Sequence, residues 1–169
     1  CLAVPFEGNR ITLHTATQST MEVQEVASRV LGIPANDVVI EVPRLGGAFG
    51  GKERGATIWA CMAALAAFLT KRPVLVKLTR AEDMHYTGKR HPFTSLWQVG
   101  YDENGKILAY DLLLLANGGA YTDLSIAILE RAMFHSENAY FIPDIRIRGY
   151  ACKTNLPPNT AFRGFGAPQ

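Results

Sequence analysis

Residues 44–53 read RLGGAFGGKE, in which four glycines flank Phe49 and the pair Lys52 and Glu53 follows. Glycine is the default residue where the backbone takes a left-handed conformation or approaches another group closely. Glycine pairs on both sides of a phenylalanine exceed what a tight turn requires. We therefore expect this segment, which we name the Phe49 loop, to bring backbone close to a bulky ligand. A glycine-rich turn without a ligand is the simpler alternative.

The length and composition indicate a globular domain with a hydrophobic core. The chain has 169 residues, of which 48% are hydrophobic and 19% charged, and these values are ordinary for such domains. Seventeen Lys and Arg against 15 Asp and Glu give a net charge of +2. Since the basic residues are scattered, we expect no nucleic-acid partner. The three cysteines form no C-x-x-C pair, which argues against a disulfide framework or a zinc site and predicts a reducing, cytoplasmic compartment.

The sequence predicts neither a signal peptide nor a membrane span. Its most apolar stretch, residues 56–69, is too short to cross a bilayer and predicts a buried helix instead. The chain opens on CLAVPF, which predicts a strand at residues 1–6, and stops just after a glycine- and aromatic-rich run. We expect a piece of a longer polypeptide.

Strands and helices alternate in the first half of the chain. A capping box formed by Ser19 and Glu22 predicts the start of a helix that Gly32 ends. A second helix, over residues 54–71, is apolar nearly all round, so we expect it to be buried on most sides. Hydrophobic periodicity predicts further strands at residues 9–17, 37–43 and 74–78.

The second half predicts a hairpin, in which DENG at residues 102–105 joins strands 94–101 and 106–116. Asp123 is predicted to cap a helix that extends to about Phe134. A helical turn and a last strand are predicted at residues 80–86 and 145–152. Because helices interleave with strands and one hairpin is present, we expect an α/β (α+β) mixture with mixed sheets and packed helices.

A phosphate-binding loop is one interpretation of the Phe49 loop. Gly46, Gly51 and Lys52 match the first seven positions of G-x-x-x-x-G-K-[ST], and KILAYD at residues 106–111 supplies an apolar run ending in aspartate. The eighth position is Glu53, whose carboxylate has the wrong charge beside a triphosphate and lacks the hydroxyl that reaches magnesium. KILAYD also follows a tight hairpin rather than a crossover. A nucleotide-binding module is therefore a disfavoured alternative.

The last segment, TAFRGFGAPQ at residues 160–169, has no helical or strand period. It cannot bury a face of its own, so we expect a rigid loop that presents backbone and aromatic rings to a cofactor. An ordinary surface loop is the alternative, but it would expose Phe162 and Phe165 to water at some hydrophobic cost.

RLGGAFGGKE and TAFRGFGAPQ together resemble the two cofactor loops of the xanthine dehydrogenase and aldehyde oxidase family. Residues 82–93, 130–140 and 151–166 also resemble family segments, in family order, so that the resemblance covers essentially the whole chain. It implies that residues 1–169 are a fragment of the molybdopterin-binding domain of a molybdenum hydroxylase, with cofactor loops at residues 44–53 and 160–169.

The resemblance implies a large enzyme that hydroxylates a carbon beside a ring nitrogen, or an aldehyde carbon, with oxygen from water. Molybdenum is held by a pterin, molybdopterin, and not by side chains, which agrees with the lack of a His/Cys cluster at ligand spacing. Electrons leave through 2Fe-2S clusters and FAD, which this segment does not bind. The implied partners are the rest of the molybdenum subunit, iron–sulfur and flavin domains or subunits, and other protomers of an oligomer. The isolated histidines are expected to be structural: His14, His85, His91 and His135.

The resemblance also assigns roles at the cofactor. Gln18 would hydrogen-bond the oxo group on molybdenum, with an exposed loop amide as the alternative. Phe49 would cover the face of the metal site, with backbone around it packed against the cofactor. The last loop would offer backbone amides or charge to the cofactor. The implied cofactor-binding residues are Gln18, Gly47, Phe49, Gly50, Ala161, Phe162 and Arg163.

Glu53, Arg131 and Phe165 are the implied substrate residues, because the purine-oxidising branch of the family has an acid and an arginine at the first two positions. Glu53 would bond ring nitrogens and carbonyls, Arg131 would neutralise negative charge that builds on the ring, and Phe165 would stack on it. A purine such as hypoxanthine or xanthine is therefore expected. The alternatives are a helix cap for Glu53, a surface ion pair between Arg131 and Glu130, and an aldehyde or other N-heterocycle substrate.

The chain departs from the family at Ala48 and Ala167, where glycine is frequent. Both methyl groups should be tolerated if neither residue has a positive φ. The family's general base is a glutamate beyond Gln169, so we expect the isolated segment to be inactive. A catalytically silent scaffold domain is a further alternative.

Overall fold

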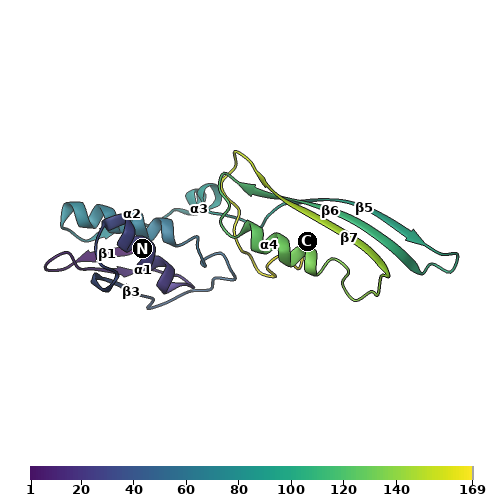
Figure 1. The fold of residues 1–169 in the computed structure, drawn as a ribbon. Coiled ribbons are helices and arrows are strands. Elements are labelled where there is room, and N and C mark those ends of the chain that lie inside the picture. The colour runs from purple at the N-terminus through teal and green to yellow at the C-terminus, as the bar shows by residue number, and fades with distance from the viewer. Residues whose placement is uncertain (169) are drawn as a thin grey trace. The chain divides into compact units, whose positions relative to one another are not determined.

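The computed structural model describes residues 1–168, and the chain divides into two compact units, Cys1–Thr87 and a second that begins at Gly88. Figure 1 shows the helices and strands of each unit. Each unit has a hydrophobic cluster of its own. The expected α/β mixture with mixed sheets is confirmed, since both sheets combine parallel and antiparallel pairs.

The first unit is built on a four-stranded sheet in the order β3-β2-β1-β4. Its strands are β1 (Leu2–Pro5), β2 (Ile11–His14), β3 (Val38–Glu41) and β4 (Val74–Leu75). β2 and β3 are parallel and are connected through α1 (Thr20–Leu31) and a short 3₁₀ turn (Ala35–Asp37), whereas β1 is antiparallel to β2 and β4. α1 and α2 (Thr57–Thr70) share one core with the sheet, and its fully buried members include Ala3, Leu13, Val23, Val38 and Ala64.

The predicted capping box at Ser19 is wrong. Ser19 is the N-cap residue of α1 but its side chain makes no capping hydrogen bond, and Glu22 pairs instead with Arg54 at 3.3 Å. A capping box forms at the start of α3 (Arg80–Tyr86), where Thr79 and Glu82 exchange side-chain to backbone bonds. These bonds lower the pKa of the Glu82 carboxyl. Both stretches have the same spacing, but only Thr79 has the extended backbone that aims its hydroxyl at the helix.

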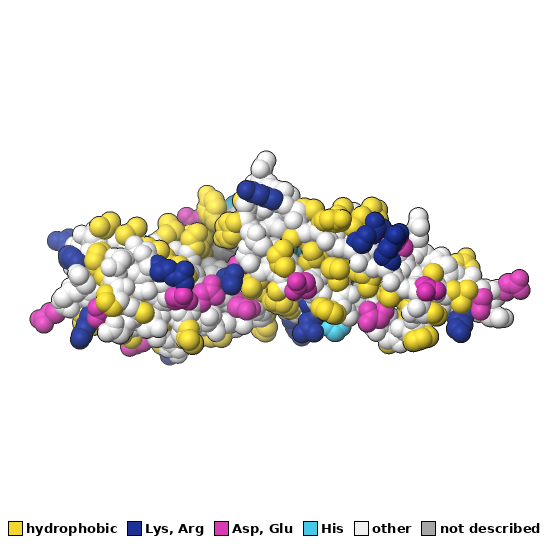
Figure 2. All heavy atoms as spheres, viewed as in Figure 1, with side chains coloured by type: hydrophobic (Ala, Val, Ile, Leu, Met, Phe, Trp, Pro, Cys, Tyr) yellow, Lys and Arg dark blue, Asp and Glu magenta, His cyan; other side chains and the backbone are white. Residues whose placement is uncertain are grey.

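Helix α2 begins at Thr57, three residues later than expected, and is not buried on most sides. Only its alanine-rich face is buried, because alanine lets the helix approach α1 and the sheet closely. The large apolar side chains point outward: Ile58, Met62, Leu65 and Leu69 are all at least 40% exposed. In Figure 2 hydrophobic side chains are visible on the surface of both units.

The second unit is a three-stranded sheet in the order β5-β6-β7, formed by Phe93–Tyr101, Ile107–Gly119 and Asp144–Lys153. The predicted hairpin is confirmed: β5 and β6 are antiparallel, and Gly105 in their connection has a φ of +78°. β6 and β7 are parallel and are connected through α4 (Ser125–Phe134). The core side chains shared by β6 and α4 include Leu112, Leu114, Ala116, Leu129 and Ala132.

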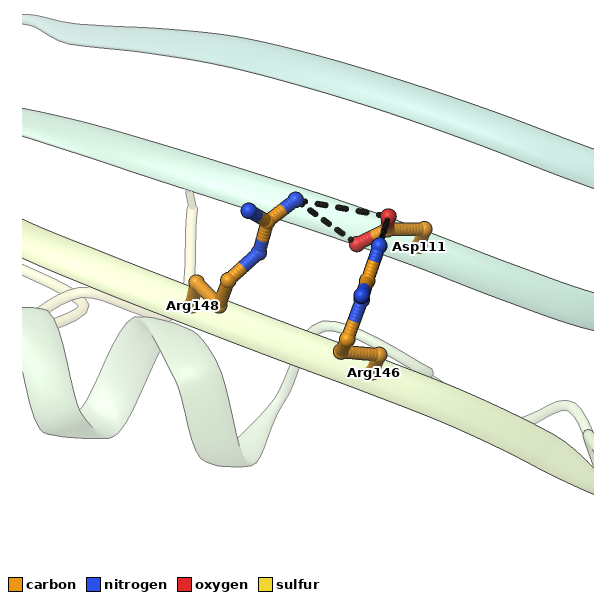
Figure 3. Close-up of polar contacts among 3 residues, drawn as sticks. All are labelled: Asp111, Arg146 and Arg148. Carbon is orange, nitrogen blue, oxygen red and sulfur yellow. Dashed lines mark hydrogen bonds and ion pairs between the residues drawn. The ribbon is translucent and has the colours of Figure 1, made fainter.

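Asp111 on β6 lies between Arg146 and Arg148 of β7 (Figure 3). Arg148 Nη2 is 3.1 Å from Asp111 Oδ1, and Arg146 donates to Oδ2. The Arg146 guanidinium is the main cause that lowers the pKa of the Asp111 carboxyl. The carboxylate at the end of KILAYD is thus occupied by a cross-strand ion pair.

The prediction that Asp123 caps α4 is wrong. The N-cap position belongs to Leu124, which makes no side-chain cap. Asp123 has a φ of +45°, and this left-handed backbone differs from the extended one that lets a capping side chain reach the helix amides.

The three cysteines, Cys1, Cys61 and Cys152, are free thiols. Across residues 1–168, no helix combines the length and the apolar character that a membrane crossing requires.

Gly119→Ala should destabilise the second unit more than Gly105→Ala. Both glycines are left-handed, with φ of +79° and +78°, so each substitution carries a similar backbone strain of about 1 kcal/mol. A Cβ at Gly119 would also lie 2.5 Å from the Pro157 carbonyl oxygen and from Pro158 Cα, whereas the space beside Gly105 is open. We expect a total loss of about 3 kcal/mol for Gly119→Ala because overpacking adds to the strain.

Urea unfolding in a Trp59→Phe background measures this difference, because Trp97 on β5 then reports the second unit alone. Equal losses for the two glycine variants would show that β6 does not end against the Pro157 segment as described.

Candidate functional site

The Phe49 loop contains four residues with a left-handed backbone within residues 46–50. Gly46 and Gly47 have φ of +68° and +89°, Phe49 has +53° and Gly50 has +94°. A positive φ is rare for a bulky residue and costs about 1–3 kcal/mol. The Phe49 ring is nevertheless 67% exposed, and a Cβ at Gly47 would lie 3.1 Å from its Cε2 atom. The loop therefore holds a strained phenylalanine on the surface, over a glycine that leaves room for its ring.

Gln18 and Thr17 join this loop from the segment before α1. The Gln18 side-chain oxygen accepts the Gly50 N–H at 3.0 Å, and the Gln18 N–H donates to Lys52 O at 2.9 Å. The buried Thr17 hydroxyl donates to the same carbonyl at 3.2 Å. The structure thus brings Gln18 together with Gly50, next to Phe49. Thr17 was missed, although it stands beside Gln18 in TATQST.

Lys52 and Glu53 contradict the phosphate-binding interpretation. Lys52 Nζ donates to Leu45 O at 2.7 Å, so the ammonium closes the loop on itself. Glu53 lies four residues before α2, in a turn in which its N–H donates to Gly50 O at 3.1 Å. It is therefore not a helix cap, and the alternative of ordinary capping is wrong. The half-buried Glu53 carboxylate has no hydrogen bond or ion pair among the described residues.

The second loop also holds a phenylalanine with a positive φ between left-handed glycines. Gly164, Phe165 and Gly166 have φ of +98°, +45° and +90°. The turn is closed by hydrogen bonds from Phe165 N to Phe162 O at 2.9 Å and from Ala167 N to Gly164 O at 3.1 Å. Gln169, the last residue of the predicted loop, lies outside the described residues.

Gly166 packs directly against α4 beside Arg131. A Cβ at Gly166 would lie 2.3 Å from Ile128 O and 3.3 Å from Arg131 Cβ. The exposed Arg131 guanidinium lies 3.1 Å from His135 Nε2 one turn later and not on Glu130, so the predicted alternative of an ion pair is wrong. The second unit thus brings Arg131 next to the loop that carries Phe165.

Buried polar groups anchor the start of this loop. The Asn159 side chain donates to Asn117 O at 2.9 Å, and Thr160 N donates to Lys89 O at 3.0 Å. Ala161 is fully buried, whereas Phe162 and Arg163 are exposed. These bonds fix the first residues of the loop, so that Phe162 and Arg163 extend from a rigid base.

His91 is a structural histidine, as expected. Its Nε2 lies 2.7 Å from the Ser125 hydroxyl, which fixes the segment before β5 to the start of α4. Burial lowers the pKa of the His91 imidazole, and the nearby Asp123 charge opposes this only in part.

The two departures from the family pattern meet the condition set for them, since neither Ala48 nor Ala167 has a positive φ. The left-handed residues around them are the glycines Gly46, Gly47, Gly50, Gly164 and Gly166 together with Phe49 and Phe165. Among residues 1–168, no group of three or more His, Cys, Asp or Glu side chains has the arrangement of a metal site.

Each unit thus carries one loop that holds a phenylalanine with a positive φ among glycines, beside a charged or amide side chain. The sequence matches the molybdopterin cofactor-binding domain family over residues 1–169. The chain belongs to this family, as the resemblance predicted.

Curated relatives and solved structures agree with this assignment. The chain is 50% identical to xanthine dehydrogenase/oxidase of Mus musculus over 169 residues, and 48% identical to xanthine dehydrogenase of Dictyostelium discoideum over 168 residues. Each match covers 99% of this chain but only 12–13% of the relative, so the chain spans about an eighth of these relatives' length.

Among solved structures, the aldehyde oxidoreductase of Desulfovibrio desulfuricans is similar with a TM-score of 0.89 at 27% identity, covering 99% of this chain and 18% of that one. Quinoline 2-oxidoreductase of Pseudomonas putida is similar with a TM-score of 0.87 at 25% identity, covering 98% of this chain and 21% of that one.

Phe49→Gly should leave the stability of the first unit unchanged or raise it by up to about 1 kcal/mol, because glycine removes the strain of the positive φ. Phe6→Gly is the matched control: Phe6 is 58% exposed but is not left-handed, and its replacement should cost about 0.5–1 kcal/mol.

Urea unfolding in a Trp97→Phe background, with Trp59 of α2 as the reporter, measures both variants. A larger loss for Phe49→Gly than for Phe6→Gly would mean that the phenylalanine serves local stability rather than a ligand.

Proposed function

We propose that this chain is part of a molybdenum hydroxylase that oxidises purines of the hypoxanthine and xanthine type. Both loops would serve a molybdopterin cofactor, and Glu53, Arg131 and Phe165 would bind the substrate. Identities of 48–50% to xanthine dehydrogenases over nearly the whole chain support this reaction class. The observation that carries the proposal is the packing of Gly166 against α4, which sets the Phe165 loop beside the Arg131 side chain.

The residues of both loops fit a bulky cofactor held by backbone. Glycines at left-handed positions keep the loop surface free of Cβ atoms, and Phe49 presents an exposed ring at the cost of strain. Gln18 keeps its side-chain N–H₂ free for an acceptor while its oxygen is bound to Gly50. Gln18, Gly47, Phe49, Gly50, Ala161, Phe162 and Arg163 would therefore hold the cofactor. The chemistry that the cofactor supplies when bound is a two-electron oxidation with oxygen from water.

The proposed substrate residues have complementary properties. The half-buried Glu53 carboxylate is not engaged by another described residue, so it is available to accept N–H groups of a heterocycle. The Arg131 guanidinium is held on one side by His135 and retains further N–H groups for negative charge that develops on the ring. Phe165 offers a flat face for stacking.

An aldehyde oxidase or another N-heterocycle hydroxylase is the second candidate within the family. The similarity to aldehyde and quinoline oxidoreductases supports it, but at 25–27% identity that similarity is much weaker than the one to xanthine dehydrogenases. The combination of Glu53 and Arg131 also favours a purine.

The outward apolar face of α2 supports a larger parent protein. Soluble proteins rarely expose a continuous apolar stripe such as Ile58, Met62, Leu65 and Leu69. We infer that the rest of the molybdenum subunit covers it, and that this subunit also supplies the general base, which we do not find in this chain. Iron–sulfur and flavin domains or subunits, an oligomeric state and a cytoplasmic location complete the proposal, and the segment alone should be inactive.

In the intact parent enzyme, Arg131→Met should lower kcat/KM for xanthine by about 10²–10³-fold, because one donor that stabilises developing charge is lost. The same variant should change kcat/KM for a simple aldehyde by less than about tenfold, since an aldehyde has no purine ring over which negative charge can spread toward Arg131.

Arg148→Met is the matched control, because Arg148 pairs with Asp111 away from the proposed site. It should leave kcat/KM for xanthine and for the aldehyde unchanged. Equal losses on xanthine and aldehyde for Arg131→Met would count against a purine-binding role.

A further inference from the structure

Arg90 lies against the second loop but has no role in the site described so far. Its guanidinium carbon is 5.2 Å from the centre of the Phe162 ring, a cation–π arrangement. A Cβ at Gly164 would be 3.8 Å from Arg90 Nη1. Arg90 therefore lies beside Phe162 and Gly164, at the place where the loop turns.

The Nη1 atom of Arg90 is buried and has no hydrogen-bond partner among residues 1–168. A guanidinium always carries its charge and five N–H donors. Leaving a charged donor buried and unpaired costs more than leaving a neutral one, commonly several kcal/mol. Buried donors in native proteins are almost always satisfied, so this one calls for a partner outside the described residues.

Arg90 also lacks an ion-pair partner among the described residues. The hydroxyl of Thr160, at the start of the same loop, is also buried without a partner. Two unpaired polar groups thus lie at a loop whose own residues offer an aromatic ring, glycines and a second cation, Arg163.

We propose that Arg90 is a cofactor-binding residue: its Nη1 N–H donates to a carbonyl or anionic oxygen of bound molybdopterin beside Phe162 and Gly164. The stack on Phe162 holds the guanidinium in place beside Gly164. The inference rests on the proposed function, because that function supplies the ligand. The substrate also carries carbonyl oxygens, so the test must distinguish the two sources.

The test uses the intact parent protein, produced in cells that make molybdopterin and in cells that cannot. Arg90→Met removes the charge, and Arg90→Lys keeps the charge but loses the planar fork. Phe162→Leu removes the ring that stacks on Arg90 and keeps an apolar side chain, and Arg148→Met is an arginine control elsewhere in the second unit. Molybdenum and pterin content, the melting temperature of both preparations, and KM for xanthine are measured for each.

We expect Arg90→Met to retain about tenfold less molybdenum and pterin than wild type, the loss typical of a charged hydrogen bond. Without the cofactor, Arg90→Met should melt at or above the wild-type temperature, because an unpaired buried charge has been removed. Arg90→Lys should retain an intermediate amount of cofactor, and Arg148→Met should equal wild type.

Three results would overturn the proposal. The first is a wild-type cofactor content in Arg90→Met. The second is an Arg90→Met protein that, without the cofactor, melts well below cofactor-free wild type, which would make Arg90 a structural support. The third is an unchanged cofactor content with a raised KM for xanthine, which would assign the acceptor to the substrate. Wild-type protein that carries no molybdenum would instead refute the proposed function itself, and this inference with it.

Discussion

The left-handed backbone at Phe49 and Phe165 is the constraint on which both loops depend. In each case a bulky residue with a φ near +50° stands next to glycines that are left-handed as well. Such backbone costs stability and is kept only where the surrounding structure enforces it. Two occurrences in one chain, both in segments without regular secondary structure, are difficult to explain by turns alone. They support the proposal that both loops present their backbone to a ligand.

Each unit enforces its own loop by different means. In the first unit, the Phe49 loop is closed by Lys52 and tied to the segment before α1 by Gln18 and Thr17. In the second unit, packing dominates: Gly166 fits against α4, and hydrogen bonds to Asn117 and Lys89 fix the chain just before the loop. The sheets and helices thus act as rigid bases for two loops that could not hold their shape alone.

Local signals in the sequence predicted much of this structure. The DENG hairpin, the helix stop at Gly32 and the glycine loops follow from residue types whose backbone preferences are strong. The predictions that were wrong concern features that depend on contacts between residues far apart in the sequence. The spacing of a capping box occurs at both Ser19 and Thr79, but Glu22 pairs with the distant Arg54, and the box forms only at Thr79. Similarly, no local pattern tells which face of α2 is buried, or that the Arg90 guanidinium meets Phe162 from far along the chain.

The most direct test of the central claim is the molybdenum content of the intact parent protein with Gly47→Ala, compared with Gly105→Ala. Both glycines are left-handed, but a methyl at Gly47 would displace the Phe49 ring, whereas Gly105 lies in an open hairpin. If the loops are shaped to hold a cofactor, Gly47→Ala should lose most of its molybdenum while it stays folded, and Gly105→Ala should keep all of it. A folded Gly47→Ala protein with full molybdenum content would contradict the account.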